Sequence, residues 1–384
     1  MSGPFYFQIP TQIIYGRHSA SQIGQVAGSS GISKAMVVTD EGVARAGVLD
    51  RILMLLQEGG IATIVYDEVE PNPTVQTVDQ AAGQYKRAGC DGVIAVGGGS
   101  PLDVGKSVGV LATNPGPVSD YLGMDKVRQP AAPVIAVPTT AGTAAEITDV
   151  AVLSDHERKL KMGLRSAFVS PRVALLDPLL TISLPPGPTR DSGLDALTHA
   201  IEAYIGVNAW HATDALALRS IELVGRYLRT AVYNGKDIEA RDGMLTASLL
   251  AGLAFHNTKL CLVHAITAPL GGAYDLPHGA SNAIVLPHAM RFMLPGAVSK
   301  YVDIAIALGE QVQGLSERTA AEKAIQAVEQ LSRDVGLPEG LSVFGVKEED
   351  LPALSETIAG LYMVPLSPRV ANAAEILEIC RAAL

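Results

Sequence analysis

The chain has 384 residues, of which 48% are hydrophobic and 18% charged, and its formal net charge is -10. This length exceeds what one ordinary hydrophobic core serves, so two domains are expected. The acidic balance argues against a nucleic-acid partner, because binding phosphates requires a basic surface.

The sequence indicates neither a secretory nor a membrane-spanning segment. The first ten residues lack a basic stretch followed by an apolar one, and no uninterrupted apolar run reaches membrane-spanning length. Cys90, Cys261 and Cys380 are widely spaced and form no paired motif, which indicates free thiols in a reducing compartment. We therefore expect a cytoplasmic enzyme with a small-molecule substrate, and neither a membrane nor a nucleic acid as a partner.

The first half of the chain alternates between strand and helix patterns. Residues 5–16 mix aromatic and β-branched side chains around a proline, which predicts a β-hairpin or two edge strands. The segments that follow have the βαβ rhythm of a parallel, Rossmann-like sheet. Strands are predicted at 35–39, 61–66, 92–96, 134–137 and 173–177, helices at 49–57 and 75–88, and a β excursion within 147–177.

Two loops of this half have the composition of ligand-binding loops. The strand at 92–96 runs into Gly97-Gly98-Gly99-Ser100, and a helix start follows. Glycines let backbone amides approach a phosphate, and a helix N-terminus favours negative charge, although a tight turn gives the same pattern. After the strand at 134–137, Thr139, Thr140 and Thr143 either line a ligand site at the sheet's carboxyl edge or cap the next helix.

The periodicity changes at the proline cluster 185–188. From there to Leu384 the apolar spacing is helical almost throughout, so we predict a boundary near residue 186 between an α/β domain, 1–186, and an all-helical domain, 187–384. The predicted helical runs are 189–207, 212–231, 238–256, 260–273, 280–293, 297–309, 317–336 and 369–383.

Four residues of the helical half form a candidate metal site. Asp195 and His199 are four apart and would share one helix face. Between His264 and His278, proline and glycine clusters predict a helix, a turn and a second helix start. If folding brings the four together, three imidazoles and a carboxylate suit Fe(II) or Zn(II) and leave room for an oxygen ligand. An Asp/His pair at this spacing is also common on helix surfaces.

With these motifs the sequence resembles the iron-dependent, group III alcohol dehydrogenase family, whose fold is that of dehydroquinate synthase. The motifs occur in order along nearly the whole chain. They are Gly97-Gly-Gly-Ser100-Pro-Leu-Asp103-Val-Gly-Lys106, Pro138-Thr-Thr-Ala-Gly-Thr143, Asp177-Pro-Leu-Leu-Thr-Ile-Ser-Leu-Pro-Pro186, Gly193-Leu-Asp195-Ala-Leu-Thr-His199-Ala-Ile-Glu202-Ala-Tyr204 and Pro277-His278-Gly279.

The resemblance implies an NAD(H)-linked, metal-dependent alcohol dehydrogenase or aldehyde reductase, and a homodimer formed through the N-terminal strands. Asp195, His199, His264 and His278 would hold the cation, with Fe(II) expected and Zn(II) as the alternative. Asp40 would meet the adenosine ribose, where a carboxylate accepts from a 2′-hydroxyl and repels a 2′-phosphate, which predicts NAD over NADP. The implied cofactor residues are Asp40, Asn72, Gly97, Gly98, Gly99, Ser100, Asp103, Thr139, Thr140, Thr143 and Lys161.

Departures from the family pattern affect the predicted catalytic residues. Many members carry a proton-relaying histidine four residues after the position of His264, and here that residue is Ala268. We therefore predict that His256, or a water chain along the nicotinamide ribose, replaces this relay; a buried structural histidine is the alternative interpretation of His256. Lys259 is predicted to pair with an anionic group on the substrate, or else to be a surface lysine whose stem covers apolar residues.

Other enzymes of this fold stay open as alternatives. They are a zinc-dependent glycerol dehydrogenase, a dehydroquinate synthase-type lyase and a maleylacetate reductase, which the run Lys259-Leu-Cys261 resembles. A catalytically silent scaffold is disfavoured because all four candidate metal ligands are present.

Overall fold

The computed structural model describes residues 5–155 and 160–384. The chain divides into two compact units, each described by itself. The α/β unit consists of Ile9–Thr140 and Ala144–Leu184; the helical unit consists of Pro185–Leu384 together with Met1–Gln8 and Ala141–Thr143. The predicted fold class, a parallel-sheet α/β part followed by a helical part, is confirmed.

The α/β unit is built on a parallel sheet. Six strands in the described residues pair in the order β3-β2-β4-β6-β9-β1, and every pairing is parallel. The strands are β1 Gln12–Tyr15, β2 Lys34–Val38, β3 Ala62–Tyr66, β4 Gly92–Gly97, β6 Val134–Pro138 and β9 Val173–Leu176.

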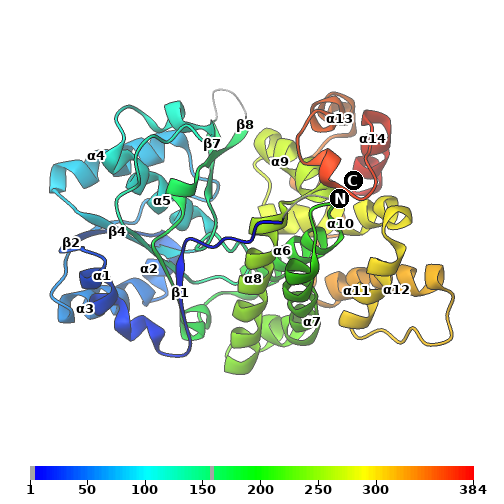
Figure 1. The fold of residues 1–384 in the computed structure, drawn as a ribbon, viewed down its shortest axis with the longest axis horizontal. Coiled ribbons are helices and arrows are strands. Elements are labelled where there is room, and N and C mark those ends of the chain that lie inside the picture. Colours follow the sequence, from blue (N-terminus) through cyan, green and yellow to red (C-terminus); the bar gives the residue numbers. More distant parts are fainter. Residues whose placement is uncertain (1–4, 156–159) are drawn as a thin grey trace. The chain divides into compact units, whose positions relative to one another are not determined.

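Helices cover both faces of this sheet (Figure 1). Successive side chains of a strand point to opposite faces. Ile94 therefore packs in the core formed with α1 and α3, and its neighbour Val93 packs in the core formed with α4 and α5. The helices of this unit are α1 Ile23–Ser29, α2 Glu41–Arg45, α3 Val48–Glu58, α4 Val75–Ala88 and α5 Gly99–Thr113, with 3₁₀ helices η1 Ser19–Gln22, η2 Val118–Tyr121, η3 Ala167–Val169 and η4 Pro178–Thr181.

A second, small sheet contains the predicted β excursion. Strands β7 Val150–Asp155 and β8 Leu160–Arg165 are antiparallel, and β5 Gly123–Met124 pairs with β8 in parallel. Residues 156–159 of the excursion lie outside the described residues. A bridge between Thr74 and Ser154 joins β7 to the loop that follows β3.

The predicted hairpin over residues 5–16 is wrong. Only β1 is a strand there, and it pairs in parallel with β9 as the edge of the large sheet. The aromatic residues before it pack on the helical unit instead: Phe5 stacks on Trp210 with ring centroids 5.4 Å apart, and Gln8 N donates to Asn257 Oδ1 at 2.8 Å. The side chain of Phe5, one of the aromatic residues that suggested a strand, thus packs on Trp210, and this stacking does not require the backbone to pair with another strand.

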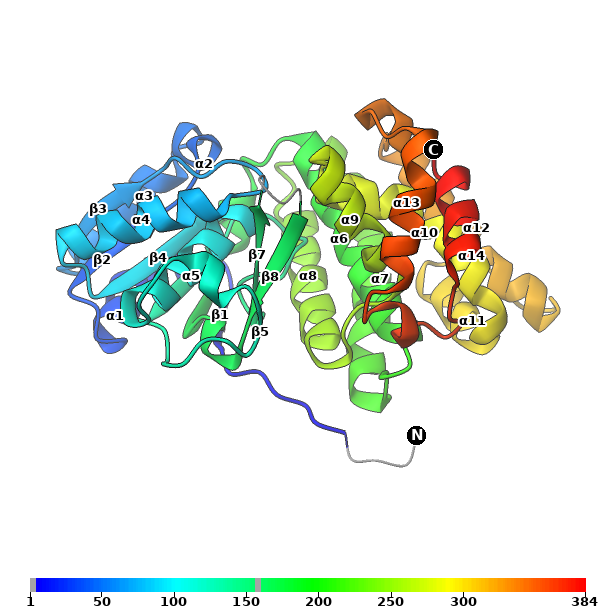
Figure 2. The same cartoon turned by 90° about the horizontal axis from the view of Figure 1, so that it is seen from above.

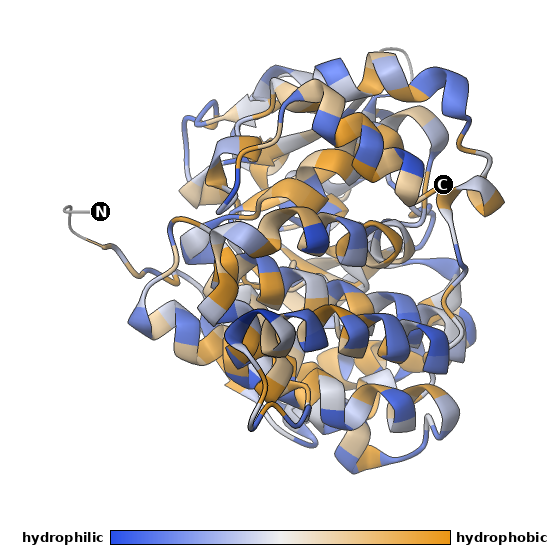
Figure 3. Cartoon of the chain, turned by 90° about the vertical axis from the view of Figure 1, so that its right-hand side faces the viewer, coloured by the Kyte–Doolittle hydropathy of each residue, from blue (hydrophilic) through white to orange (hydrophobic). Residues whose placement is uncertain are grey.

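The helical unit packs its longest helices, α6, α7 and α8, against one another (Figure 2). Hydrophilic and hydrophobic residues alternate along its ribbons, as amphipathic helices require (Figure 3). Its helices are α6 Pro186–Ile205, α7 His211–Tyr233, α8 Ile238–Thr258, α9 Leu262–Tyr274, α10 His278–Met293, α11 Val298–Ala307, α12 Glu317–Asp334, α13 Leu351–Ala359 and α14 Ala373–Ala382, with 3₁₀ helices η5 Leu294–Gly296, η6 Leu341–Phe344, η7 Glu348–Asp350 and η8 Val364–Leu366.

Among the described residues, no single helix has both the length and the hydropathy needed to cross a bilayer. Helices α8 and α9 reach those values only when counted together, across a bend of 97°.

Candidate metal centre and nucleotide site

Helix α6 positions the first two candidate ligands, Asp195 and His199. From residue 193 to residue 205 every residue of this helix is buried, so its orientation is fixed by packing on all sides. Gly193 leaves room for a side chain of α7, because a Cβ there would lie 2.3 Å from Leu228 Cδ1. The two ligands therefore lie on one face of a helix with little freedom to move.

The other two ligands come from helix starts on either side of a turn. His264 lies in the first turn of α9, just after the bend that follows α8, and His278 is the first residue of α10. Gly279 lets α10 begin directly against α6, because a Cβ there would lie only 2.3 Å from the carbonyl oxygen of Asp191. The helix, turn and helix start predicted between these histidines are present.

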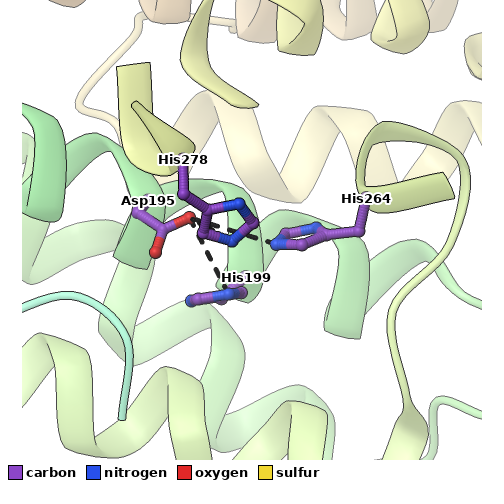
Figure 4. Close-up of side chains that lie close together, drawn as sticks. All are labelled: Asp195, His199, His264 and His278. Carbon is purple, nitrogen blue, oxygen red and sulfur yellow. Dashed lines mark ion pairs between the residues drawn. The ribbon is translucent and has the colours of Figure 1, made fainter. Parts of the chain in front are cut away.

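The four side chains point toward one another (Figure 4). Their donor atoms all lie within 4.8 Å of one another. Asp195 Oδ1 is 3.8 Å from His199 Nε2, 4.0 Å from His264 Nε2 and 3.9 Å from His278 Nε2. Donors at the corners of a tetrahedron around Fe(II) or Zn(II) would be about 3.4 Å apart, so the three Asp195–histidine separations would shorten by about half an ångström and the widest separation in the set by more. The donor set fits such a cation.

The cluster is enclosed except at His278. The side chains of Asp195, His199 and His264 are buried, whereas that of His278 is 42% exposed. Catalytic metal sites keep one position open for a substrate oxygen, while structural sites are closed. The exposed side of His278 gives this cluster an accessible face.

Electrostatics within the cluster favour a cation. Burial acts to raise the pKa of Asp195, but the charges of His199, His278 and His264 and a hydrogen bond from Asn282 bring it below its ordinary value. Burial lowers the pKa of His199, and Asp195 only partly opposes this. An ionised carboxylate beside a neutral imidazole is the protonation state that a metal requires.

Three groups outside the donor set hold the ligands. Glu202 Oε2 lies 2.6 Å from His264 Nδ1, and the carbonyl oxygen of Gly142 lies 3.2 Å from His199 Nδ1. Asn282 Nδ2 donates to Asp195 Oδ1 at 2.8 Å and lies 3.0 Å from His264 Nε2. The two Nδ1 contacts fix the orientation of metal-binding histidines, whereas the Asn282 amide lies at the ring nitrogen of His264 that faces the donor cluster.

Glu202 and Asn282 were not predicted as site residues, although their spacing in the sequence carried a signal. Glu202 follows His199 by three residues and Asp195 by seven, so all three share a helix face. Asn282 follows His278 by four residues and shares its face of α10.

In the α/β unit, predicted nucleotide residues gather at the carboxyl ends of β2, β4 and β6. The strand order reverses between β2 and β4, where parallel sheets bind their ligands. Gly97 has a φ of 149° at the end of β4, and a Cβ there would lie 2.6 Å from Pro101 Cγ. Its carbonyl oxygen accepts from Thr139 N at 2.9 Å, and a Cβ on Gly98 would lie 3.3 Å from Thr140 Cγ2.

Asp40 and the start of α5 complete this edge. The Asp40 side chain caps α2, because its Oδ1 accepts from Val43 N at 2.9 Å, and its Oδ2 lies 3.4 Å from where a Gly97 Cβ would be. Gly98 is the N-cap of α5, and Gly99 and Ser100 form its first turn. This edge presents backbone amides of a helix N-terminus beside a carboxylate, as the predicted pyrophosphate and ribose contacts require.

The remaining predicted cofactor residues lie in different surroundings. Lys161 Nζ on β8 donates to Asn72 Oδ1 at 2.5 Å, so these two are brought together. Asp103 pairs with the buried Lys106 at 2.8 Å and accepts from Val152 N at 2.9 Å, contacts that join α5 to β7. Thr143 belongs to the helical unit.

The two predicted catalytic residues lie at the end of α8. His256 is buried and follows Phe255, whose ring is 4.5 Å from that of His199. Lys259 has a φ of 68°, and its Nζ donates to the carbonyl oxygen of His256 at 2.7 Å. A lysine bonded to one of the last carbonyls of a helix stabilises the helix C-terminus.

Comparison with known proteins matches both units to one family. The family model described as "Iron-containing alcohol dehydrogenase" matches residues 10–178, and that described as "Fe-containing alcohol dehydrogenase family, C-terminal" matches residues 189–384.

Individual relatives align over almost their full length. The 1,3-propanediol dehydrogenase of Klebsiella pneumoniae is 43% identical over 381 residues, 99% of this chain and 98% of that protein. The NAD-dependent methanol dehydrogenase of Bacillus methanolicus is 39% identical over 378 residues, 98% of this chain and 99% of that protein. The solved structure of a 1,3-propanediol oxidoreductase has a TM-score of 0.96 at 43% identity and covers 100% of both chains.

Proposed function

The chain belongs to the iron-containing alcohol dehydrogenase family, and on this basis we propose that it exchanges a hydride between a small neutral alcohol or aldehyde and NAD. The observation that carries the proposal is the convergence of Asp195, His199, His264 and His278, with donor atoms within 4.8 Å of one another. When bound, the cation would act as a Lewis acid on the substrate oxygen, and the nicotinamide would exchange the hydride. Fe(II) is the proposed ion, with Zn(II) as the alternative.

The residues of the chain would position the cation and the cofactor and provide the charge that attracts the cation. Asp195 provides the negative charge that attracts the cation, and the imidazoles fix its place on the buried face of α6. Gly97, Gly98 and the first turn of α5 would hold the pyrophosphate, with Asp40 at the ribose. A small neutral substrate is supported by the names of two relatives, a propanediol dehydrogenase and a methanol dehydrogenase.

The test is an assay at the absorbance band of reduced nicotinamide, after chelation and after restoring Fe(II) or Zn(II). We expect NADH-dependent reduction of short neutral aldehydes, lost on chelation and restored by one of the two ions. A chelated protein that gains neither activity nor thermal stability from either ion would contradict the proposal. Glycerol, assayed in parallel with NAD, tests the glycerol dehydrogenase alternative.

We also propose that the substrate proton leaves through His256, because a histidine at position 268 is absent and His256 adjoins the residue that packs on His199. His256→Gln is expected to alter the pH dependence of kcat. A profile that coincides with that of the unmodified enzyme would exclude this role.

For Lys259 the bond to the His256 carbonyl supports a helix-capping role over recognition of an anionic substrate. Lys259→Ala is therefore expected to change kcat/KM by the same factor for neutral and acidic aldehydes. A loss confined to acidic aldehydes would instead assign Lys259 to an anionic substrate.

A further inference from the structure

Glu202 is a buried carboxylate outside the set of candidate metal ligands. It lies on α6 with 0% exposure, one turn beyond His199. Burying a carboxylate is costly unless hydrogen bonds replace its hydration. Glu202 has such bonds: Oε1 accepts from Val263 N at 2.6 Å and from Cys261 Sγ at 3.2 Å, and Oε2 meets His264 Nδ1 at 2.6 Å. All three partners belong to the start of α9.

The contact with His264 determines which ring nitrogen carries the proton. An ionised carboxylate only accepts hydrogen bonds, so His264 Nδ1 must carry the hydrogen and Nε2 must present its lone pair. Nε2 is the atom that lies 4.0 Å from Asp195 Oδ1 within the donor cluster. Glu202 therefore holds the ring in the tautomer that can bind a cation.

The contact with Val263 fixes the backbone of the same segment. The chain bends by 97° between α8 and α9, and the N-cap of α9, Cys261, makes no side-chain capping bond. The first amides of a helix need acceptors, and a negative charge there is favourable. Glu202, on α6, supplies both the acceptor and the negative charge at the start of α9. The same carboxylate therefore fixes the backbone at this helix start and the ring of His264.

We propose that Glu202 is a positioning residue that sets the tautomer and orientation of His264 and thereby the cation affinity of the site. The proposal rests on the metal-dependent function proposed above. It assigns Glu202 no contact with substrate or cofactor.

Glu202→Gln is the most selective variant, because it preserves shape while replacing one acceptor atom by a donor. With its NH₂ toward His264, the amide would require an accepting Nδ1, which places the ring hydrogen on Nε2. With its NH₂ toward Val263, it would set two donors against each other. We expect affinity for Zn(II), titrated by calorimetry into chelated protein, to fall by about 10–100-fold, as for other groups that orient metal-binding histidines.

Two comparisons separate positioning from general structure. Glu146→Gln changes another buried carboxylate, in the α/β unit, and should leave Zn(II) affinity unchanged. Glu202→Asp keeps the charge and should restore part of the affinity. Circular dichroism should show unchanged helix content in all three variants.

The tautomer can also be measured directly in the metal-free protein. With ¹⁵N-labelled histidine and His264 assigned by its absence in His264→Gln, the ring should show hydrogen on Nδ1 in the unmodified chain. Hydrogen on Nε2, or a Glu202→Gln variant with unchanged Zn(II) affinity, would overturn the proposal. This measurement needs neither metal nor a folded Glu202 variant, so a chain that binds no cation would contradict the proposed function without deciding the role of Glu202.

Discussion

At the scale of single residues, Asp40 combines a structural and an electrostatic role that substitution can separate. Its Oδ1 caps α2 through Val43 N, and its charge lies at the sheet edge beside Gly97. Asparagine caps helices as well as aspartate does but carries no charge. Asp40→Asn should therefore keep the stability of the α/β unit while weakening the discrimination against a 2′-phosphate.

We expect the ratio of kcat/KM for NADH over NADPH to fall by at least about tenfold in Asp40→Asn, since juxtaposed like charges cost several kcal/mol. Parallel kinetics with both cofactors measure this ratio, and thermal unfolding monitors the cap. An unchanged ratio would remove Asp40 from the ribose site.

Only some residues of the metal centre could be predicted from the sequence. Asp195 and His199 were predictable because a helix places residues four apart on one face, and the helix start at His278 was marked by proline and glycine. Glu202 and Asn282 have the same kind of spacing, but a carboxylate or an amide on a helix face is usually solvated. Their role depends on contacts with α9, which no local pattern encodes.

At the scale of elements, the start of α10 depends on the absence of a side chain at residue 279. A Cβ there would meet the Asp191 carbonyl oxygen at 2.3 Å and Asp195 Cβ at 3.3 Å, so Gly279→Ala must displace α10 from α6. His278 would move with it. We expect a loss of about 1–3 kcal/mol in stability, typical of overpacking, together with weaker Zn(II) binding.

The matched control for this substitution is Gly28→Ala. Gly28 lies in α1 and has no positive φ, and a Cβ there would meet no atom within 4 Å. Alanine favours a helix over glycine by up to about 1 kcal/mol, so this variant should be as stable as the unmodified chain or slightly more so. Melting temperatures and calorimetric titrations compare the two, and equal behaviour would contradict the close approach of α10 to α6.

Helices with a long apolar pattern and clear end signals were predicted correctly. Segments with a short pattern, or with a packing partner far away in the sequence, were not. Helix α4 was predicted at its observed limits because Thr74 caps it and Gly89 ends it. Helix α13 was missed, since only Leu351, Ser355 and Ile358 of its nine residues are buried and no long apolar stripe forms. The aromatic stretch before β1 was misassigned because Trp210, on which Phe5 stacks, is more than half the chain away.

At the scale of the whole molecule, Glu146 makes stability depend on pH. Burial raises the pKa of its carboxyl to about 7, although its own backbone amide and the charge of Lys106 oppose the shift. The folded protein therefore keeps a proton that the unfolded chain releases near its ordinary value of 4.5. This contribution to stability is complete below pH 4.5 and is lost as the pH rises to about 7.

Glu146→Gln should remove this dependence. Relative to the unmodified chain, we expect the variant to be more stable at pH 8, by up to about 3 kcal/mol for a shift of this size, and nearly equal at pH 4.5. Melting temperatures at the two pH values give the comparison. An identical difference at both would show that Glu146 does not titrate in this range.

The helical unit is assembled from three separate stretches of the chain, and this has a consequence during synthesis. The backbone amide of Gln8 donates to Asn257, which is synthesised 249 residues later. The ribosome therefore releases the N-terminal aromatic stretch, and later Gly142, long before their partners exist. A polypeptide expressed from Pro185 onward would lack the acceptor of His199 Nδ1 and the ring that stacks on Trp210, so this unit cannot form all of its contacts from its helices alone.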